Sequence, residues 1–367
     1  MNVTESPQKV HFKGLDTLRA IAAIVVVVSH IELIKSRNGI PALNIHYLKL
    51  PDDHLAVILF FILSGFLITY LLMKEKEDNG SISFKNFYLR RIFRIWPVYY
   101  LVIILSFILF NPKYTFKTIA LCLGVFPNIA SALNIEWDVS PQIWSIGVEE
   151  QFYLFWPLLI YIIPKNKLLT CLLVFFIAYT ILPHAIRFTN GFTFKSDELN
   201  MFTDKFFPQS KFNCMSLGGI FGYLYALKRK ELGFFYKGII AYPSIILSFA
   251  LWFTAFKIAN FNDVLYSILF GIMILNVATN KNLKINLDFK PLNFLGKISY
   301  GIYMYHWIII LLVIKFIPTN LIANHLTYNI ILYLTVLGLS IFVAFISFKT
   351  IERYFLGLKN KYQTKYK

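Results

Sequence analysis

The first apolar stretch of the chain reads LDTLRAIAAIVVVVSHIELI over residues 15–34. A helix of this length is about 30 Å long, which matches the hydrocarbon core of a bilayer. The stretch also contains three ionisable side chains, Asp16, Arg19 and His30. Ionisable groups are costly at membrane depth, so each is a functional candidate. Arg19 and His30 are eleven residues apart, so they share one helix face, roughly 16 Å apart along the axis.

The whole chain has the composition of a helical membrane protein. Hydrophobic residues make up 57% of its 367 residues and charged residues only 15%, which is too apolar for an ordinary soluble domain. The formal net charge of +17 could indicate a nucleic-acid partner. The basic residues, however, form short patches between apolar segments, as membrane topology requires. We therefore expect an all-α polytopic membrane protein that binds no nucleic acid.

Apolar segments of membrane length occur about ten times. They cover residues 15–34, 55–73, 95–111, 146–163, 168–187, 212–228, 238–256, 262–279, 298–317 and 328–348. A further stretch, 115–133, is interrupted by Pro127 and Asn128, and we interpret it as re-entrant or interfacial. Ten spans place the basic segments around Lys228, from Lys281 to Lys297 and after Lys349 on one side, with both termini. The positive-inside rule assigns that side to the cytoplasm.

An arginine cluster, Arg90, Arg91 and Arg94, lies at the end of the predicted cytoplasmic loop 74–94. Arg90 and Arg94 are four residues apart on a helix, where two guanidinium groups repel each other unless an anion lies beside them. Phosphate is a natural partner for such a cluster. The alternative is an ordinary positive-inside anchor, with Trp96 and Tyr99 at the level of the lipid headgroups.

Polar residues also occur inside later spans. Ser64 and Gly65 in the second span would let another backbone or a ligand approach closely, although helix packing alone would explain them. The fourth span begins with WSIGVEEQFY over residues 144–153. In this segment Ser145 and Glu149 share a helix face at the predicted outer entrance, and Glu150 points about 100° away.

The ninth span carries a polar stripe of Ser299, Tyr303 and His306 at i, i+4 and i+7, which should face protein or a cavity. For His306 we favour a structural histidine that is hydrogen-bonded to a neighbouring helix. Four other histidines lie in predicted outer loops or at span ends and are assigned no role: His46, His54, His184 and His325.

Several classes of site are absent from the sequence. Cys122, Cys171 and Cys214 are isolated and form no C-x2-C pair, so we expect neither a disulfide framework nor a metal site. The sequence has no phosphate-binding G-x-x-x-x-G-K-[ST] loop, no G-x-G-x-x-G, no H-E-x-x-H and no G-x-S-x-G. These absences argue against an NTPase, a zincin and an α/β-hydrolase.

In their order along the chain, these segments resemble the membrane-bound acyltransferase 3 family, which includes many bacterial O-acetyltransferases of surface polysaccharides and lipopolysaccharides. The matching motifs are R-x10-H from Arg19 to His30, F-x-x-S-G-x-L over 61–67, R-x-x-R at Arg91 and Arg94, W-S-x-x-x-E over 144–149 and the segment from Ser299 to His306. Ile146 and Met304 replace leucines of the commonest pattern, and both changes conserve volume. The motifs lie between residues 13 and 355, so we expect 1–367 to form a single acyltransferase domain without a soluble SGNH-type domain.

The resemblance implies a multi-pass enzyme of the bacterial cytoplasmic membrane. It would take an acyl group, normally acetyl, from cytoplasmic acetyl-CoA and transfer it to a glycan or lipid-linked sugar on the outer side. Arg90, Arg91 and Arg94 would bind the phosphates of CoA. Arg19 could hold the part of CoA near the thioester, or it could simply pair with Asp16 at i and i+3.

His30 is the expected catalytic residue, as the general base for the acceptor hydroxyl or as a transiently acetylated nucleophile. Glu149 could orient His30 or bind sugar hydroxyls. Ten residues are expected to support the substrates or the structure of the site: Asp16, Ser64, Gly65, Trp144, Ser145, Tyr153, Ser299, Tyr300, Tyr303 and His306.

A transporter or flippase is the alternative function, because intramembrane Arg, His and Glu also serve as substrate or proton sites. The two halves of the chain lack internal symmetry, and the arginine cluster suits a nucleotide donor better. A scaffold of a polysaccharide assembly complex is weaker still, since it would not need His30.

Overall fold

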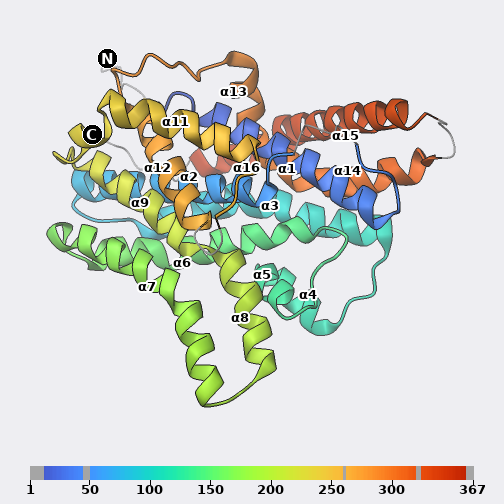
Figure 1. Ribbon diagram of the computed structural model, residues 1–367, viewed down its shortest axis with the longest axis horizontal. Coiled ribbons are helices and arrows are strands. Elements are labelled where there is room, and N and C mark those ends of the chain that lie inside the picture. Colours follow the sequence, from blue (N-terminus) through green and yellow to red (C-terminus); the bar gives the residue numbers. More distant parts are fainter. Residues whose placement is uncertain (1–11, 44–49, 259–261, 320–323, 361–367) are drawn as a thin grey trace.

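The computed structural model describes residues 12–43, 50–258, 262–319 and 324–360, and in these residues it contains helices and no strands. Within these described ranges, seven helical segments are long and apolar enough to cross a membrane. They are α1 (Leu15–Arg37), α2 (Asp53–Asn79), α3 (Phe84–Phe110), α7 (Lys165–Phe192), α12 (Asn262–Thr279), α14 (Ser299–Phe316) and the segment His325–Leu358 that starts with α15 (His325–Ser347). Figure 1 shows these helices in one bundle. The predicted all-α polytopic fold is confirmed.

Helices also occupy the other three predicted spans. They are α6 (Trp144–Ile162), α9 (Phe212–Ala226) and α11 (Gly238–Phe253). The polar residues near the start of α6 lower its hydropathy, and α9 and α11 have only 15 and 16 residues. A helix therefore lies at every predicted span, while the count of ten spans and the cytoplasmic position of both termini stay predictions.

The ambiguous stretch 115–133 folds into two short helices, α4 (Phe116–Leu123) and α5 (Pro127–Ala132). Eight residues of helix are about 12 Å long, less than half the thickness of the hydrocarbon core. Pro127 begins α5 at a position where its missing N–H costs no helical hydrogen bond. The short 3-10 helix η1 (Pro141–Ile143) then leads directly into α6.

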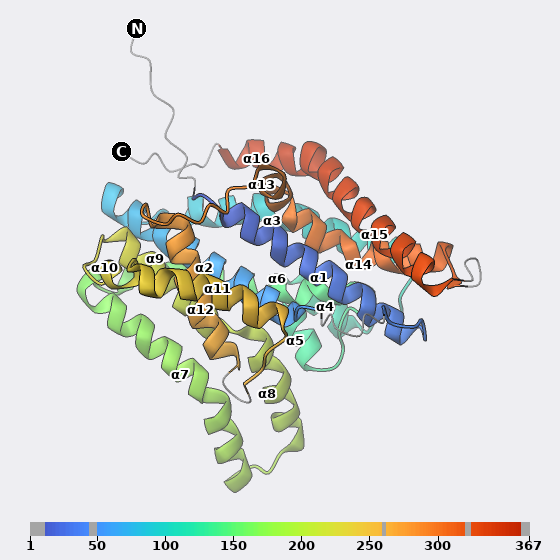
Figure 2. The same ribbon diagram turned by 45° about the horizontal axis from the view of Figure 1, so that its top comes forward.

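Two segments between predicted spans, 74–94 and 188–211, are mostly helical. The predicted loop 188–211 contains α8 (Asp197–Ser210), and α7 runs on to Phe192, so the two helices form a hairpin that projects from the bundle (Figures 1 and 2). The predicted loop 74–94 is almost entirely helical, since α2 and α3 extend into it. Polar helix ends of this kind have no apolar run to reveal them. The remaining short elements are α10 (Leu232–Phe235), α13 (Lys290–Lys297), the π-helix η3 (Phe348–Glu352) and α16 (Arg353–Asn360).

Helix α2 is the centre of the bundle and packs most closely against α9. A Cβ at Gly65 would overlap the backbone carbonyl of Met215, and a Cβ at Gly218 or Gly222 would overlap carbonyl oxygens of α2. Small residues four apart allow two helix backbones to touch in this way. The prediction for Gly65 is confirmed, whereas the G-x-x-x-G pair on α9 was a signal that we missed.

Helix α13 fixes the start of α1. A Cβ at Gly296 would overlap the backbone carbonyl of Asp16, and the hydroxyl of Thr17 donates to Asn293 Oδ1 at 2.8 Å. Gly14 precedes the helix with φ 73°, a left-handed conformation that favours glycine. These contacts set the position of Arg19, one turn into α1.

Candidate functional site

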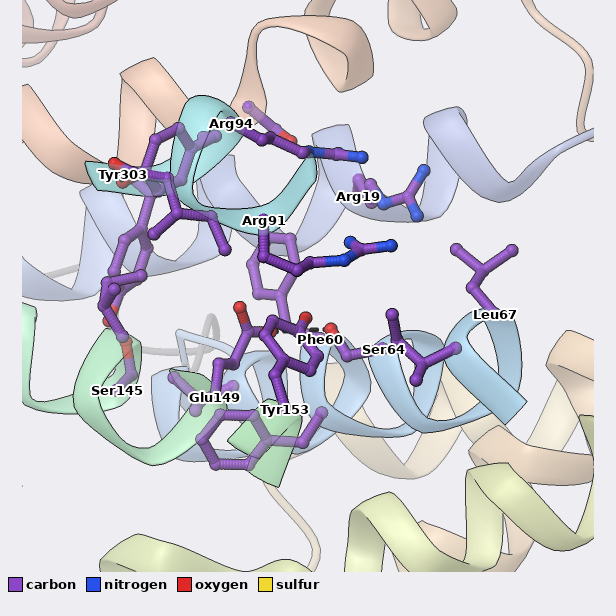
Figure 3. A pocket seen from close by; sticks show the side chains of 17 residues that line it. Arg19, Phe60, Ser64, Leu67, Arg91, Arg94, Ser145, Glu149, Tyr153 and Tyr303 are labelled. Atoms are coloured by element: carbon purple, nitrogen blue, oxygen red, sulfur yellow. Dashed lines mark hydrogen bonds between the residues drawn. The ribbon is translucent and has the colours of Figure 1, made fainter. Parts of the chain in front are cut away.

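Five helices, α1, α2, α3, α6 and α14, surround a cavity of about 850 Å³, counted with its open mouth. We call it the central cavity. Figure 3 shows the guanidinium groups of Arg19, Arg91 and Arg94 gathered toward one end and Tyr303 and Ser145 at the other. The central cavity therefore has a basic end and an end closed by hydroxyl-bearing side chains.

At the basic end, Arg91 is held by aromatic rings. Its guanidinium carbon lies 5.3 Å from the ring centroid of Tyr153 and 5.5 Å from that of Phe87. Such cation–π contacts stabilise a buried cation without neutralising it. Within the part of the chain that the structure describes, the buried Nε of Arg91 has no hydrogen-bond partner. A ligand with acceptor oxygens would satisfy this donor.

Arg19 both forms an ion pair and lines the central cavity. Its guanidinium donates to Asp16 Oδ1 at 3.0 Å, and its side chain also lines the central cavity. The predicted i, i+3 pair with Asp16 is therefore present, and it leaves the cation facing the cavity beside Arg94.

The predicted arginine cluster is divided. Arg91 and Arg94 line the central cavity. Arg90 lies outside that lining and forms an ion pair with the buried Glu75, 3.1 Å between Nη2 and Oε2. Glu75 also accepts a hydrogen bond from the backbone N–H of Ser83, at 2.9 Å. In place of Arg90, it is Arg19 from α1 that completes the basic end.

Glu149 faces the same cavity from α6. Its Oε1 accepts the hydroxyl hydrogen bond of Ser64 at 2.6 Å, drawn as a dashed line in Figure 3. The neighbouring carboxylate, Glu150, points elsewhere and accepts from the indole N–H of Trp96 at 2.9 Å. The helix geometry of α6 predicted this separation, but the sequence did not reveal that Ser64 and Glu149 would meet.

Other predicted support residues also surround the central cavity. Ser299 and Tyr300 line it, and their hydroxyls donate to backbone carbonyls, Ser299 to Gly296 at 2.8 Å and Tyr300 to Ile95 at 2.7 Å. Trp144 is outside the lining and packs edge-on against Phe61, with ring centroids 6.3 Å apart.

A pair of histidines lies beyond the closed end. His30 Nδ1 is 2.7 Å from His306 Nε2, and the planes of the two rings are only 17° apart, with ring centroids separated by 5.0 Å. His306 Nδ1 lies 2.6 Å from the backbone carbonyl oxygen of Tyr303. On the other side, His30 Nε2 is 3.3 Å from Asp53 Oδ2. A series of contacts thus connects Asp53 to His30, His30 to His306, and His306 to the backbone carbonyl of Tyr303 in α14.

The backbone carbonyl of Tyr303 sets the donor and acceptor roles in this series of hydrogen bonds. A carbonyl oxygen only accepts, so His306 Nδ1 must carry a hydrogen, and in a neutral imidazole its Nε2 then accepts. His30 Nδ1 consequently donates to His306. The remaining nitrogen, His30 Nε2, faces the Asp53 carboxylate; because an ionised carboxylate only accepts, this contact is a hydrogen bond when Nε2 carries a proton.

The carboxylate that reaches His30 is Asp53 rather than Glu149, which contacts Ser64 instead. Asp53 was not among the site residues predicted from the sequence, although an acidic residue two positions before the second predicted span was a usable signal. His306 is hydrogen-bonded to a neighbouring helix, as predicted, and its partner is His30. Of the histidines without an assigned role, His54 lies 3.3 Å from Asp263, and His46 is outside the described residues.

Comparison with known protein families identifies the chain. An acyltransferase domain model, Acyl_transf_3, matches residues 12–349, which include every helix around the central cavity. The chain belongs to the acyltransferase 3 family. This family assignment confirms the resemblance found from the motifs.

Two curated relatives of the acyltransferase 3 family illustrate the match. The chain is 27% identical to the peptidoglycan O-acetyltransferase OatA of Listeria monocytogenes, over 98% of this chain and 60% of that protein. It is 28% identical to the O-acetyltransferase OatA of Staphylococcus aureus, over 83% of this chain and 51% of that protein. The chain thus spans little more than half the length of these relatives. No solved structure is detectably similar.

Proposed function

We propose that the protein is a membrane O-acetyltransferase that transfers an acetyl group from cytoplasmic acetyl-CoA to a hydroxyl of a cell-envelope glycan or its lipid-linked precursor. The observation that carries the proposal is the position of a three-arginine cavity next to the Asp53–His30–His306 chain. The relatives support O-acetyl transfer as the reaction. Because one of them is a peptidoglycan O-acetyltransferase, peptidoglycan is the first acceptor to test.

The basic end of the central cavity suits the phosphates of CoA. Arg19, Arg91 and Arg94 present guanidinium groups to one space, and guanidinium forks match phosphate oxygens in charge and geometry. The buried Nε of Arg91, which has no hydrogen-bond partner among the described residues, gives such an oxygen a donor to bind. Ser64 and Glu149 lie farther along the cavity, where their polar atoms could meet the amide groups of the pantetheine arm.

His30 acts as the general base in the proposed reaction. Its Nε2 takes the proton of the acceptor hydroxyl while the hydroxyl oxygen attacks the thioester carbonyl. The O–H and C–S bonds break, the O–C bond forms, and the thiolate of CoA leaves and takes up the proton from the His30 imidazolium, which restores the neutral base. Asp53 stabilises the imidazolium that forms, and His306 fixes the orientation of the ring.

Transient acetylation of His30 is the mechanistic rival. The two mechanisms differ when no acceptor is present, because only the rival then forms a stoichiometric acetyl-protein. Rapid quenching after mixing with labelled acetyl-CoA would measure this. A burst of label on His30 would replace direct transfer with the two-step mechanism.

The transporter hypothesis gains no support, since the chain belongs to an acyltransferase family.

The function is tested with purified protein in proteoliposomes that receive labelled acetyl-CoA on one side and peptidoglycan fragments or other envelope glycans on the other. We expect label to appear as alkali-labile O-acetyl ester on an acceptor. A wild-type protein that neither hydrolyses acetyl-CoA nor transfers its acetyl group to any acceptor would refute the proposal.

A further inference from the structure

The closed end of the central cavity is a hydrogen-bonded wall made of Tyr303, Ser145 and Gln142. The hydroxyl oxygens of Tyr303 and Ser145 are 2.7 Å apart. Both hydroxyls also reach the backbone carbonyl oxygen of Gln142, at 3.1 and 3.2 Å. The side-chain amide of Gln142 in turn donates to the carbonyl of Met304 at 2.8 Å. The wall therefore ties η1 and α6 to α14.

Packing makes this wall rigid. The side chain of Tyr303 is buried, and its ring centroid lies 6.2 Å from that of Phe60 and 5.7 Å from that of His306. Val57 lines the same end of the cavity from α2. A close-packed aromatic ring with an engaged hydroxyl cannot move aside without losing these packing contacts and hydrogen bonds.

The acyl group of a bound acyl-CoA would lie against this wall. The phosphates are attracted to the arginines at the basic end, so the thioester points to the opposite end, where Figure 3 shows Tyr303 and Ser145. Val57 is four residues from Asp53, one turn along α2. The closed end thus lies next to the histidine pair, with 5.7 Å between the ring centroids of Tyr303 and His306.

We propose that Tyr303 sets the length of the acyl group and that the wall selects acetyl over longer acyl chains. This inference rests on the proposed function, because it takes acyl-CoA as the molecule in the central cavity. An additional methylene in a tight apolar pocket changes kcat/KM by roughly 10- to 200-fold. Butyryl-CoA, two methylenes longer, should therefore be used at least about 100-fold less well than acetyl-CoA.

Specificity and chemistry can be separated at this residue. The group of Tyr303 that orients His306 is the backbone carbonyl, which every substitution retains. The group that meets the acyl chain is the ring. Tyr303→Ala removes the ring, whereas Tyr303→Phe removes only the hydroxyl. Tyr305→Ala is a matched control, because Tyr305 is a buried tyrosine of the same helix that bonds Ser347 at 2.8 Å and lies outside the cavity lining.

The experiment compares kcat/KM for acetyl-CoA and butyryl-CoA in the wild type and these three variants. We expect the acetyl preference of the wild type to fall by at least about 10-fold in Tyr303→Ala, and to persist in Tyr303→Phe and Tyr305→Ala. If Tyr303→Ala does not fold, Val57→Ala enlarges the same end without removing a hydrogen bond.

A binding assay separates this inference from the proposed function. Both thioesters are made to compete with labelled acetyl-CoA on the detergent-solubilised wild-type and variant proteins. We expect butyryl-CoA to compete poorly with the wild type and well with Tyr303→Ala, whether or not any acetyl transfer is detected. The inference is overturned if the wild type binds or uses both thioesters equally, or if neither Tyr303→Ala nor Val57→Ala changes the preference.

Discussion

Replacing Asp53 by asparagine should slow acyl transfer about tenfold without weakening the binding of acetyl-CoA. Asp53 Oδ2 is 3.3 Å from His30 Nε2, and a hydrogen bond to a charged group contributes about 1.5–3 kcal/mol. The Asp53 side chain is 38% exposed, so solvent screening favours the lower limit. About 1.4 kcal/mol of lost transition-state stabilisation corresponds to a tenfold lower kcat. Asparagine keeps the shape of the side chain and removes its charge.

The assay is steady-state transfer of labelled acetyl, with KM for acetyl-CoA measured in parallel. KM should change little, because Asp53 lies outside the lining of the central cavity. Asp52→Asn is the matched control: Asp52 caps α2 and pairs with Lys257 at 2.9 Å, and asparagine is an equally good helix cap. A kcat for Asp53→Asn within twofold of the wild type, or an equal loss in Asp52→Asn, would refute the assignment of Asp53.

Three further tests use substitutions in other parts of the protein. Arg91→Ala should raise KM for acetyl-CoA by about tenfold or more, because a charge-assisted contact is lost. Arg90→Ala breaks the ion pair with Glu75, so it should lower the thermal stability and change KM less. Equal increases of KM in the two variants would contradict the different positions assigned to Arg90 and Arg91. Gly65→Ala should destabilise the protein by about 3 kcal/mol, because its Cβ meets backbone, whereas Gly338→Ala, whose Cβ meets open space, should leave the melting temperature in detergent unchanged or slightly higher. His306→Ala should lower kcat by roughly tenfold through loss of the hydrogen bond that orients His30, and an unchanged kcat would show that this bond has no role in the reaction.

The sequence predicted the parts of the fold that depend on apolar length. Each predicted span contains a helix because a run of about 20 apolar residues has few other stable states in a bilayer. The helix α8 was missed because its sequence is mostly polar and carries no such run. The short helices α4 and α5 occupy a stretch that already looked interrupted, at Pro127.

At the site, the sequence predicted residue types more successfully than partners. The i, i+3 pair of Asp16 and Arg19 follows from helix geometry within one segment and is present in the structure. The contacts of His30 with His306 and Asp53 join three helices. Helical periodicity indicates which face of a helix is polar, but the choice of partner depends on how the helices pack, which no single segment records.

The most direct test of the account measures acetyl-CoA binding and acetyl transfer on the same sample of His30→Ala. His30 lies outside the lining of the central cavity, so acetyl-CoA should bind with unchanged affinity. Transfer should fall by at least about 100-fold, as for the loss of a general base, and the exposed His325→Ala should retain both activities. Undiminished transfer by His30→Ala, or loss of acetyl-CoA binding together with transfer, would contradict the account.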